Sequence, residues 1–225
     1  MLKWYPSYIF VIRKLYTMPN WCSNLITITG DKKKISIIKH ALESIKKVPE
    51  GEKEPYVFET LVGREPHLTG GQYKTEWYDS NVNYWGTKWD VSYDSCGPEY
   101  DDEEIKLCPD TAWSPPIEFC NQLVKMYGVK VYIFYSEPGI GFSGQTDIYL
   151  DEDGILHTDD EEYGYLEGLY ILDKDQFWGE VEYYIDSYGE NDEDSVEKYV
   201  EETFPFITEE DKKEIINQIN EHHNG

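Results

Sequence analysis

Apolar and polar residues alternate along two stretches of the first 150 residues, as is typical of half-buried strands. Within residues 24–29, leucine and threonine alternate with two isoleucines, which predicts a strand that ends at Gly30. Residues 129–135 show the strongest alternation in the chain, and a partner strand is expected to follow through residues 146–150 after a turn. The pattern therefore predicts one early strand and one later hairpin.

Two other segments carry apolar residues at the spacing of a helix face. In the first, isoleucine or leucine occupies positions 35, 38, 42 and 45, and Asp31 is expected to cap the N-terminus. Pro49, Gly51 and Pro55 are expected to stop this helix. The second helix is predicted over residues 117–127, with Gly128 as its C-cap.

The region between these helices gives weaker signals. Glycine, proline and charge dominate residues 50–78, which predicts a long excursion with at most short structure. Apolar and polar residues alternate on either side of Gly86 within residues 80–95, so we interpret this segment as a strand with a bulge at that glycine. Ile105 and Leu107 are expected to begin a further short strand.

The resulting order, β, α, β, β, α, β, is that of a ferredoxin-like domain. We therefore predict an α+β fold with an antiparallel sheet and two helices on one face. Beyond it, residues 163–172 are interpreted as a strand pair, and three short acidic helices are expected with Asp175, Ser195 and Thr208 as N-caps. Residues 151–225 are thus predicted to be an acidic, mainly helical C-terminal region.

Charge is distributed unevenly along the chain. The formal net charge is −25, and the last 89 residues hold 27 Asp/Glu against four Lys/Arg. Such a field repels nucleic acid and acidic lipid and attracts basic protein surfaces. Twenty tyrosines and seven tryptophans supply faces for half-buried strands or for recognition. Direct binding to nucleic acid or to a membrane is therefore not expected.

Cysteine usage and hydropathy indicate the compartment. The four cysteines are widely separated and lack zinc-site spacing, so reduced thiols are expected, with no metal and no cofactor; they are Cys22, Cys96, Cys108 and Cys120. The opening segment is only faintly like a signal sequence, because its apolar run is short and is followed by Arg13 and Lys14. No stretch has the roughly 18–20 apolar residues of a membrane span. We expect a cytoplasmic protein.

Four ordered motifs carry a family resemblance: MPNWCSNLITITG from Met18, YWGTKWDV from Tyr84, TAWSPP from Thr111 and YSEPGIGFSG from Tyr135. Together they resemble the YubB-like ferredoxin-fold proteins of phages and conjugative plasmids. The resemblance covers roughly residues 18–150 and implies a ferredoxin-like domain of mobile-element origin, but no reaction. It also implies that residues 1–17 are an N-terminal extension.

Several motifs that suggest chemistry have simpler structural interpretations. Asp151, Asp153 and Gly154 fit a turn between strands better than a calcium loop, because the EF-hand register would place Asp160 where a bidentate Glu is required. The glycine-rich run over residues 139–144 enters a strand and not a helix, which favours a hairpin over a phosphate loop. None of the five histidines lies in a nucleophile motif.

Polar residues within the shared motifs define one candidate site, which would lie on a floor of tryptophan if the strands converge. Its members are Trp85, Lys88, Asp90, Ser114 and Glu137. The favoured alternative is that Trp21, Trp85, Trp89 and Trp113 form an aromatic core and that Lys88 pairs locally with Asp90. No catalytic residue is assigned.

The leading hypothesis is therefore protein–protein binding, in which an acidic surface docks on a basic host protein. The carboxylates proposed to form it are Asp159, Asp160, Glu161, Glu162, Asp192, Glu193, Asp194, Glu201 and Glu202. In its sharpest form, the protein is an anti-defence inhibitor that mimics DNA for a nucleic-acid-binding or defence protein. The alternatives are a small enzyme of unknown reaction near Lys88, Asp90 and Glu137, and a structural module that forms homo-oligomers.

Overall fold

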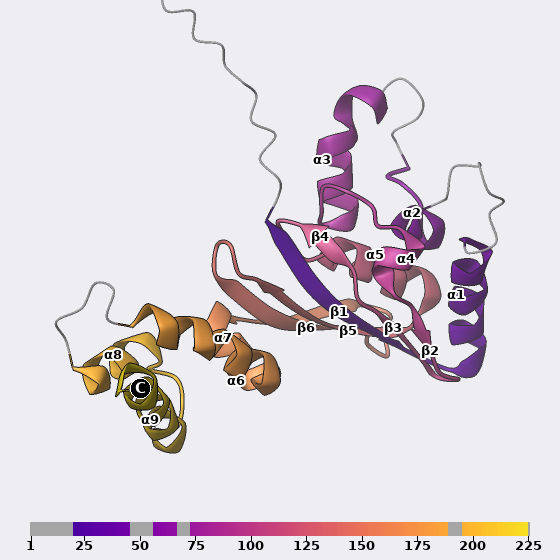
Figure 1. Ribbon diagram of the computed structural model, residues 1–225. Coiled ribbons are helices and arrows are strands. Elements are labelled where there is room, and N and C mark those ends of the chain that lie inside the picture. The colour runs from indigo at the N-terminus through magenta and orange to yellow at the C-terminus, as the bar shows by residue number, and fades with distance from the viewer. Residues whose placement is uncertain (1–19, 46–55, 67–72, 189–194, 225) are drawn as a thin grey trace, which may run out of the picture.

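The computed structural model describes residues 20–45, 56–66, 73–188 and 195–224 (Figure 1). Within this part of the chain, seven strands form one sheet: β1 (Trp21–Thr29), β2 (Glu99–Tyr100), β3 (Glu104–Leu107), β4 (Asp110–Ala112), β5 (Lys130–Glu137), β6 (Phe142–Leu150) and β7 (Leu156–Gly164). The strand order is β2-β3-β1-β5-β6-β7, with β4 also paired to β1, and every pairing is antiparallel. β7 therefore lies at an edge of the sheet.

Helices surround this sheet in two groups. The first group is α1 (Lys32–Ile45), α2 (Val57–Val62), α3 (Tyr73–Trp85), α4 (Tyr93–Cys96) and α5 (Ile117–Tyr127). The second group is α6 (Tyr165–Leu172), α7 (Lys174–Ser187), α8 (Val196–Thr203) and α9 (Glu209–Asn224). The two groups are well separated in space; α6 contacts β5, β6 and β7, and α8 and α9 lie beyond that end of the sheet (Figure 1).

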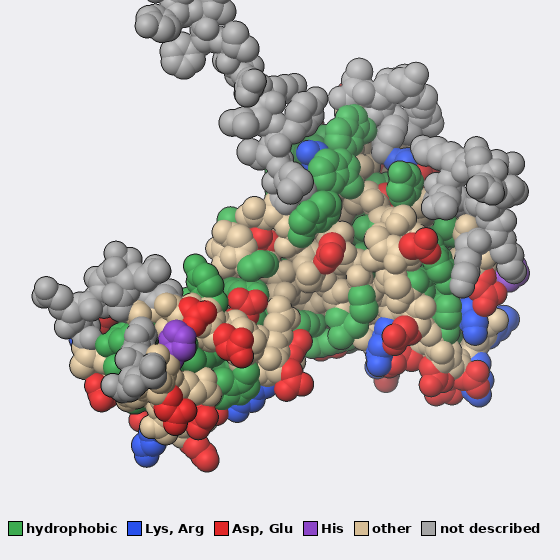
Figure 2. Space-filling view, viewed as in Figure 1, with side chains coloured by type: hydrophobic (Ala, Val, Ile, Leu, Met, Phe, Trp, Pro, Cys, Tyr) green, Lys and Arg blue, Asp and Glu red, His purple; other side chains and the backbone are tan. Residues whose placement is uncertain are grey.

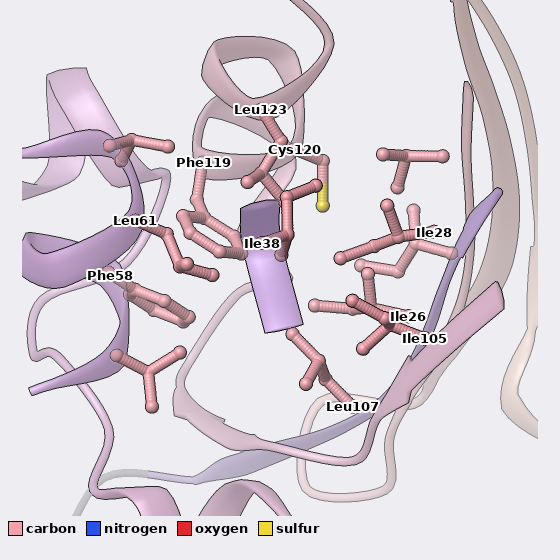
Figure 3. Packing of buried hydrophobic residues seen from close by; sticks show 14 of the residues in the cluster. Ile26, Ile28, Ile38, Phe58, Leu61, Ile105, Leu107, Phe119, Cys120 and Leu123 are labelled. Carbon is pink, nitrogen blue, oxygen red and sulfur yellow. The ribbon is translucent and has the colours of Figure 1, made fainter. Parts of the chain in front are cut away.

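The main core forms where one face of the sheet meets the first group of helices. Strand side chains with a two-residue period point into it, including Ile26 and Ile28 of β1, both fully buried. Figure 3 shows them facing Ile38 of α1 and Cys120 of α5. The apolar spacing seen in the sequence at 35, 38, 42 and 45 is thus the buried face of α1.

Several local predictions are confirmed. Asp31 Oδ1 accepts hydrogen bonds from the backbone N–H groups of Lys33 and Lys34, both at 3.1 Å, so it caps α1. Gly128 ends α5 with a φ of +62°, which is the left-handed conformation that glycine favours at this position. Side chains of Ser195 and Thr208 accept backbone hydrogen bonds at the starts of α8 and α9. The predicted stop at residues 49–55 and the extension over residues 1–17 lie outside the described residues.

The prediction of a strand over residues 80–95 is wrong. Residues 80–85 are the last turns of α3, and Gly86, with a φ of +83°, ends that helix. Trp77, Asn81 and Trp85 lie on one face of α3 at a spacing of four residues. The apparent alternation of apolar and polar residues around Gly86 hid this helical period in the sequence.

The segment after residue 155 also differs from expectation. Residues 156–164 form a single strand paired with β6 along its length, and 165–172 form α6 and not a strand. The next helix is capped by Asp173 and not by Asp175, because the Asp173 carboxylate accepts from the Gln176 N–H at 3.0 Å. The sheet thus continues past residue 150, where a domain boundary was predicted.

The second hydrophobic cluster joins α6–α9. It buries Phe177, Val181 and Ile185 of α7 against residues of α6, α8 and α9. Phe134 of β5 packs against this cluster, which ties the helical group to the face of the sheet opposite the main core. The apolar residues of α6–α9 therefore form a second hydrophobic core, separate from the main core.

Gly168 controls how α6 docks on β6. A Cβ at this position would overlap the Ser143 hydroxyl, which donates to the backbone oxygens of Gly164 and Tyr165. We expect Gly168→Ala to lower the free energy of unfolding by about 1–3 kcal/mol, measured by denaturant titration. The double variant Ser143→Gly, Gly168→Ala lacks the hydroxyl group that the new Cβ would overlap. If the alanine is equally destabilising in that background, the close approach is not the cause.

Candidate functional site

An open cleft of about 640 Å³ lies between α2, α3, α4 and the first strands of the sheet. Its lining combines aromatic rings with a few polar groups: Trp21, Tyr56, Arg64, Trp77, Asn81, Trp85, Trp89, Asp90, Val91, Ser92, Ser95, Asp110, Thr111 and Ala112. We call this feature the aromatic cleft. Figure 2 shows hydrophobic side chains running along α3 on this side of the molecule. Its size and composition are those of a ligand site.

Four tryptophans line the cleft: Trp85 is a buried anchor, Trp77 is half-buried, and Trp21 and Trp89 are exposed. Trp85 is 1% exposed, packs edge-on against Phe58 and donates its indole N–H to the Gly63 carbonyl at 3.0 Å. Trp21 and Trp89 remain 47% and 38% exposed, with ring centroids 6.1 Å apart. The predicted aromatic core is therefore real only at Trp85, because Trp21, Trp89 and Trp113 are all exposed.

Cationic side chains already lie on these rings. The Lys88 ammonium is 4.3 Å from the Trp89 centroid and 5.1 Å from that of Trp113. Trp113 has a φ of +71°, a conformation uncommon for a residue with a side chain. Arg64 lies 5.3 Å from the Trp85 ring and pairs with Glu59 at 2.5 Å. The expected local pair of Lys88 with Asp90 is replaced by cation–π contacts.

Asp90 accepts hydrogen bonds from the N-terminus of α2, although it lies 31 residues after Glu59 in the sequence. Its Oδ1 accepts from the N–H groups of Phe58 and Val91, both at 2.7 Å, and its Oδ2 accepts from Glu59 N–H at 2.8 Å. Phe58 and Glu59 are the second and third residues of α2, so Asp90 serves as the N-cap that Tyr56 does not supply. Burial raises the pKa of this carboxyl to about 6, against the opposing effect of the three N–H donors.

Three members of the predicted polar site, Lys88, Ser114 and Glu137, lie outside the lining of the cleft. Ser114 donates to the Gly86 carbonyl at 2.7 Å, which fixes the end of α3. Glu137 is 1% exposed and accepts from the backbone N–H groups of Gly139 and Ile140 at 2.9 and 2.6 Å. Its carboxylate therefore shapes the β5–β6 turn. Of the five predicted residues, Trp85 and Asp90 line the cleft.

Sequence reasoning missed most of the cleft. Tyr56 and Arg64 flank α2, while Asp110 lies at the start of β4, and no local pattern links them. One signal was present: Trp77, Asn81 and Trp85 are four residues apart and share a face of α3.

The predicted acidic surface is brought together only in part. Asp159, Asp160, Glu161 and Glu162 are consecutive, exposed residues of β7, and their side chains alternate between the two faces of the sheet. A groove of about 380 Å³ beside them is lined by Gln145, Asp147, Thr158, Asp159, Asp160 and Glu161. Hydrogen bonds from Tyr163 and Gln145 hold the pKa of Glu161 below its usual value. We call these four residues the β7 acidic edge.

The remaining predicted carboxylates lie elsewhere. Glu201 and Glu202 are on α8, where Glu201 pairs with Lys212 at 2.7 Å and Glu202 lies 3.9 Å from Lys198. Residues 192–194, predicted to add three acidic side chains, fall outside the described residues. The acidic surface described by the structure is therefore centred on β7.

The motifs that were interpreted as structural behave as such. Asp151 Oδ1 accepts from the N–H groups of Asp153 and Ile155, and its Oδ2 lies 2.8 Å from His157 Nε2, so this carboxylate organises the β6–β7 turn. Residues 139–141 form the turn before β6, which confirms the hairpin. Each cysteine is a free thiol, and burial raises the pKa of Cys22 to about 12.

No group of three or more His, Cys, Asp or Glu side chains in the described part of the chain is arranged to hold a metal ion. No helix within the described ranges combines the length and apolar character needed to span a bilayer.

Comparison with known proteins supports the fold class. A family model described as the ferredoxin-like domain in Api92-like protein matches residues 84–219, which confirms the predicted ferredoxin-like class. The match crosses residue 150 and includes β7 and α6–α8. The crystal structure of a protein Api92 from Yersinia pseudotuberculosis is similar at 13% identity and a TM-score of 0.40, covering 65% of this chain and 99% of that chain. No curated protein matches.

Proposed function

This chain belongs to the family defined by the ferredoxin-like domain of Api92-like proteins, and from that premise we propose that it acts by binding a basic partner protein along β7. The observation that carries the proposal is an open strand edge with four consecutive exposed carboxylates. β6 pairs with one side of β7, and no strand among the described residues pairs with the other side.

The edge combines two kinds of recognition. Unpaired backbone N–H and C=O groups of an edge strand are able to pair with an added strand. The carboxylates on both faces repel acidic strands and favour a partner rich in lysine or arginine. The same charges also discourage pairing of two copies through β7, because like charges would lie opposite one another. The edge therefore selects a basic partner over a second copy of this chain.

The spacing of the carboxylates favours a partner that otherwise holds nucleic acid. Successive residues of a strand advance by about 3.4 Å, and successive phosphates on one strand of B-DNA advance by about 3.4 Å along the helix axis. Because these side chains alternate between the two faces of the sheet, a basic groove along one face meets a carboxylate at about twice that advance, which corresponds to every second phosphate. The resemblance to YubB-like proteins of phages and plasmids makes a host defence protein the partner class that we propose.

Neutralising the β7 acidic edge is expected to weaken binding of a short lysine-rich peptide by about fourfold or more, since four exposed charge contacts contribute about 0.2–1 kcal/mol each. The variant carries Asp159→Asn, Asp160→Asn, Glu161→Gln and Glu162→Gln in the full chain. Affinity would be measured by fluorescence anisotropy at low and high salt, and the wild-type affinity should fall as salt rises.

The matched control removes the same charge from α7 and α9, with Glu182, Glu210, Glu214 and Glu221 all changed to Gln. These side chains are also exposed, and the net charge changes equally. If both variants weaken binding to the same extent, only net charge matters and β7 is not the contact surface.

The DNA-mimic form of the proposal has its own test. The wild-type chain is expected to displace labelled duplex DNA from a basic DNA-binding protein, and the β7 variant is expected to lose this activity. Binding without displacement would contradict mimicry and leave the protein-binding proposal standing.

A further inference from the structure

We propose that the aromatic cleft binds an arginine side chain presented by an extended segment of a partner protein. The acidic edge of β7 does not use this cleft, whose lining residues come from α2, α3, α4, β1, β4 and nearby loops. The inference therefore adds a second contact site, and it shares with the proposed function only the basic character of the partner.

The first argument is the behaviour of the cations that the chain itself supplies. Arg64 stacks over Trp85 in the cleft wall and pairs with the carboxylate of Glu59. Lys88 lies over Trp89 and Trp113 at the rim. The same surface thus already holds a guanidinium by one ring and one carboxylate, which is the arrangement that an incoming arginine would need.

The second argument is the exposed ring of Trp21 beside that of Trp89, of which Lys88 covers one face. Trp21 and Trp89 are 47% and 38% exposed, with ring planes tilted by 44°. Tryptophan has the most favourable face for a cation, and arginine stacks on it through a flat guanidinium. Large aromatic side chains exposed in a concave site are also typical of binding hot spots.

The third argument is a carboxylate with spare acceptor capacity. Both oxygens of Asp90 already accept backbone N–H groups. Asp110 accepts one bond, from the Ser23 hydroxyl to its Oδ1 at 2.8 Å, and this residue is exposed at the mouth of the cleft. A guanidinium stacked on Trp21 would pair with Asp110, the diagonal neighbour of Trp21, which lies opposite Ser23 in the β1–β4 ladder.

Charge decides between classes of planar ligand. The cleft lining contains two carboxylates and one guanidinium, with the Lys88 ammonium at its rim, within a chain of formal net charge −25. An anionic nucleotide is therefore disfavoured, and a cation is favoured over a neutral ring that would gain stacking alone.

The test titrates the full chain with a capped Gly-Arg-Gly peptide and follows the tryptophan indole N–H signals by NMR. This peptide is too short to add a strand along β7, and the β7 variant separates binding in the cleft from charge attraction to that edge. Replacing its arginine by citrulline, the neutral isostere, is expected to weaken binding about tenfold, the loss expected for one charge-assisted hydrogen bond. Equal binding of the two peptides would overturn guanidinium recognition.

Three variants locate the site. Asp110→Asn and the double variant Trp21→Ala, Trp89→Ala are expected to weaken binding of the arginine peptide about tenfold or more, while Tyr183→Ala, an exposed ring on α7, leaves it unchanged. Unchanged binding by both cleft variants, or no saturable binding by the wild type, would refute the inference. The β7 variant should bind the arginine peptide as the wild type does, so failure at one site is distinguishable from failure at the other.

Discussion

Replacing Trp85 by alanine is expected to lower the free energy of unfolding by about 3–5 kcal/mol, the range for removal of a buried aromatic side chain. Trp85 is 1% exposed, contacts Phe58 in the main core and donates to Gly63 at the end of α2. Its removal leaves a cavity and an unsatisfied carbonyl between α2 and α3. Denaturant titration followed by circular dichroism measures the change.

The exposed Trp89 provides the matched control. Trp89→Ala is expected to change the free energy of unfolding by about 0.5 kcal/mol or less, as is usual at a surface position. Equal losses in the two variants would contradict the distinction between the buried anchor Trp85 and the exposed rings of Trp21 and Trp89.

Asp90→Ala is expected to destabilise the protein by about 2–4 kcal/mol, because α2 loses its N-cap and buried N–H donors lose their acceptor. The three affected donors belong to Phe58, Glu59 and Val91. Asp110→Ala, which removes a more exposed carboxylate of the same cleft, is expected to cost far less. A loss at Asp90 no larger than that at Asp110 would contradict the capping role.

The pH dependence of this effect has a definite sign. The pKa of Asp90 is about 6 in the folded chain, above the value of 3.8 for the free side chain. Below about pH 4 the group is protonated in both states, and between about pH 4 and 6 the unfolded state releases the proton first. The stabilising contribution of Asp90 therefore falls as the pH rises through this window. Asp90→Asn lacks this titration, so its stability deficit relative to wild type should shrink between pH 4 and 7; a growing deficit would contradict the raised pKa.

Elements with local signals were predictable from the sequence. Asp31, Ser195 and Thr208 cap helices through bonds to residues two or three positions ahead, so the short segment around each is sufficient. The β5–β6 hairpin was predictable because its strands alternate and its turn is rich in glycine. These are interactions within a few residues, which sequence patterns record directly.

The candidate site was less predictable because it depends on contacts between distant segments. Asp90 caps a helix that begins 33 positions earlier in the sequence, and Asp110 reaches the cleft through pairing of β4 with β1. β7 was missed because consecutive carboxylates have low strand propensity, and its partner β6 supplies the pairing that holds them extended. Contacts between distant segments, and not the secondary-structure propensity of the local sequence, determine these features.

The most direct test of the proposed binding role is amide hydrogen exchange on the full chain with and without the lysine-rich peptide. If a basic partner adds along the open edge, backbone amides of β7 should gain protection while those of α7 and α9 remain unchanged. Protection spread evenly over the acidic helices, or absent from β7 at saturating peptide, would contradict the account.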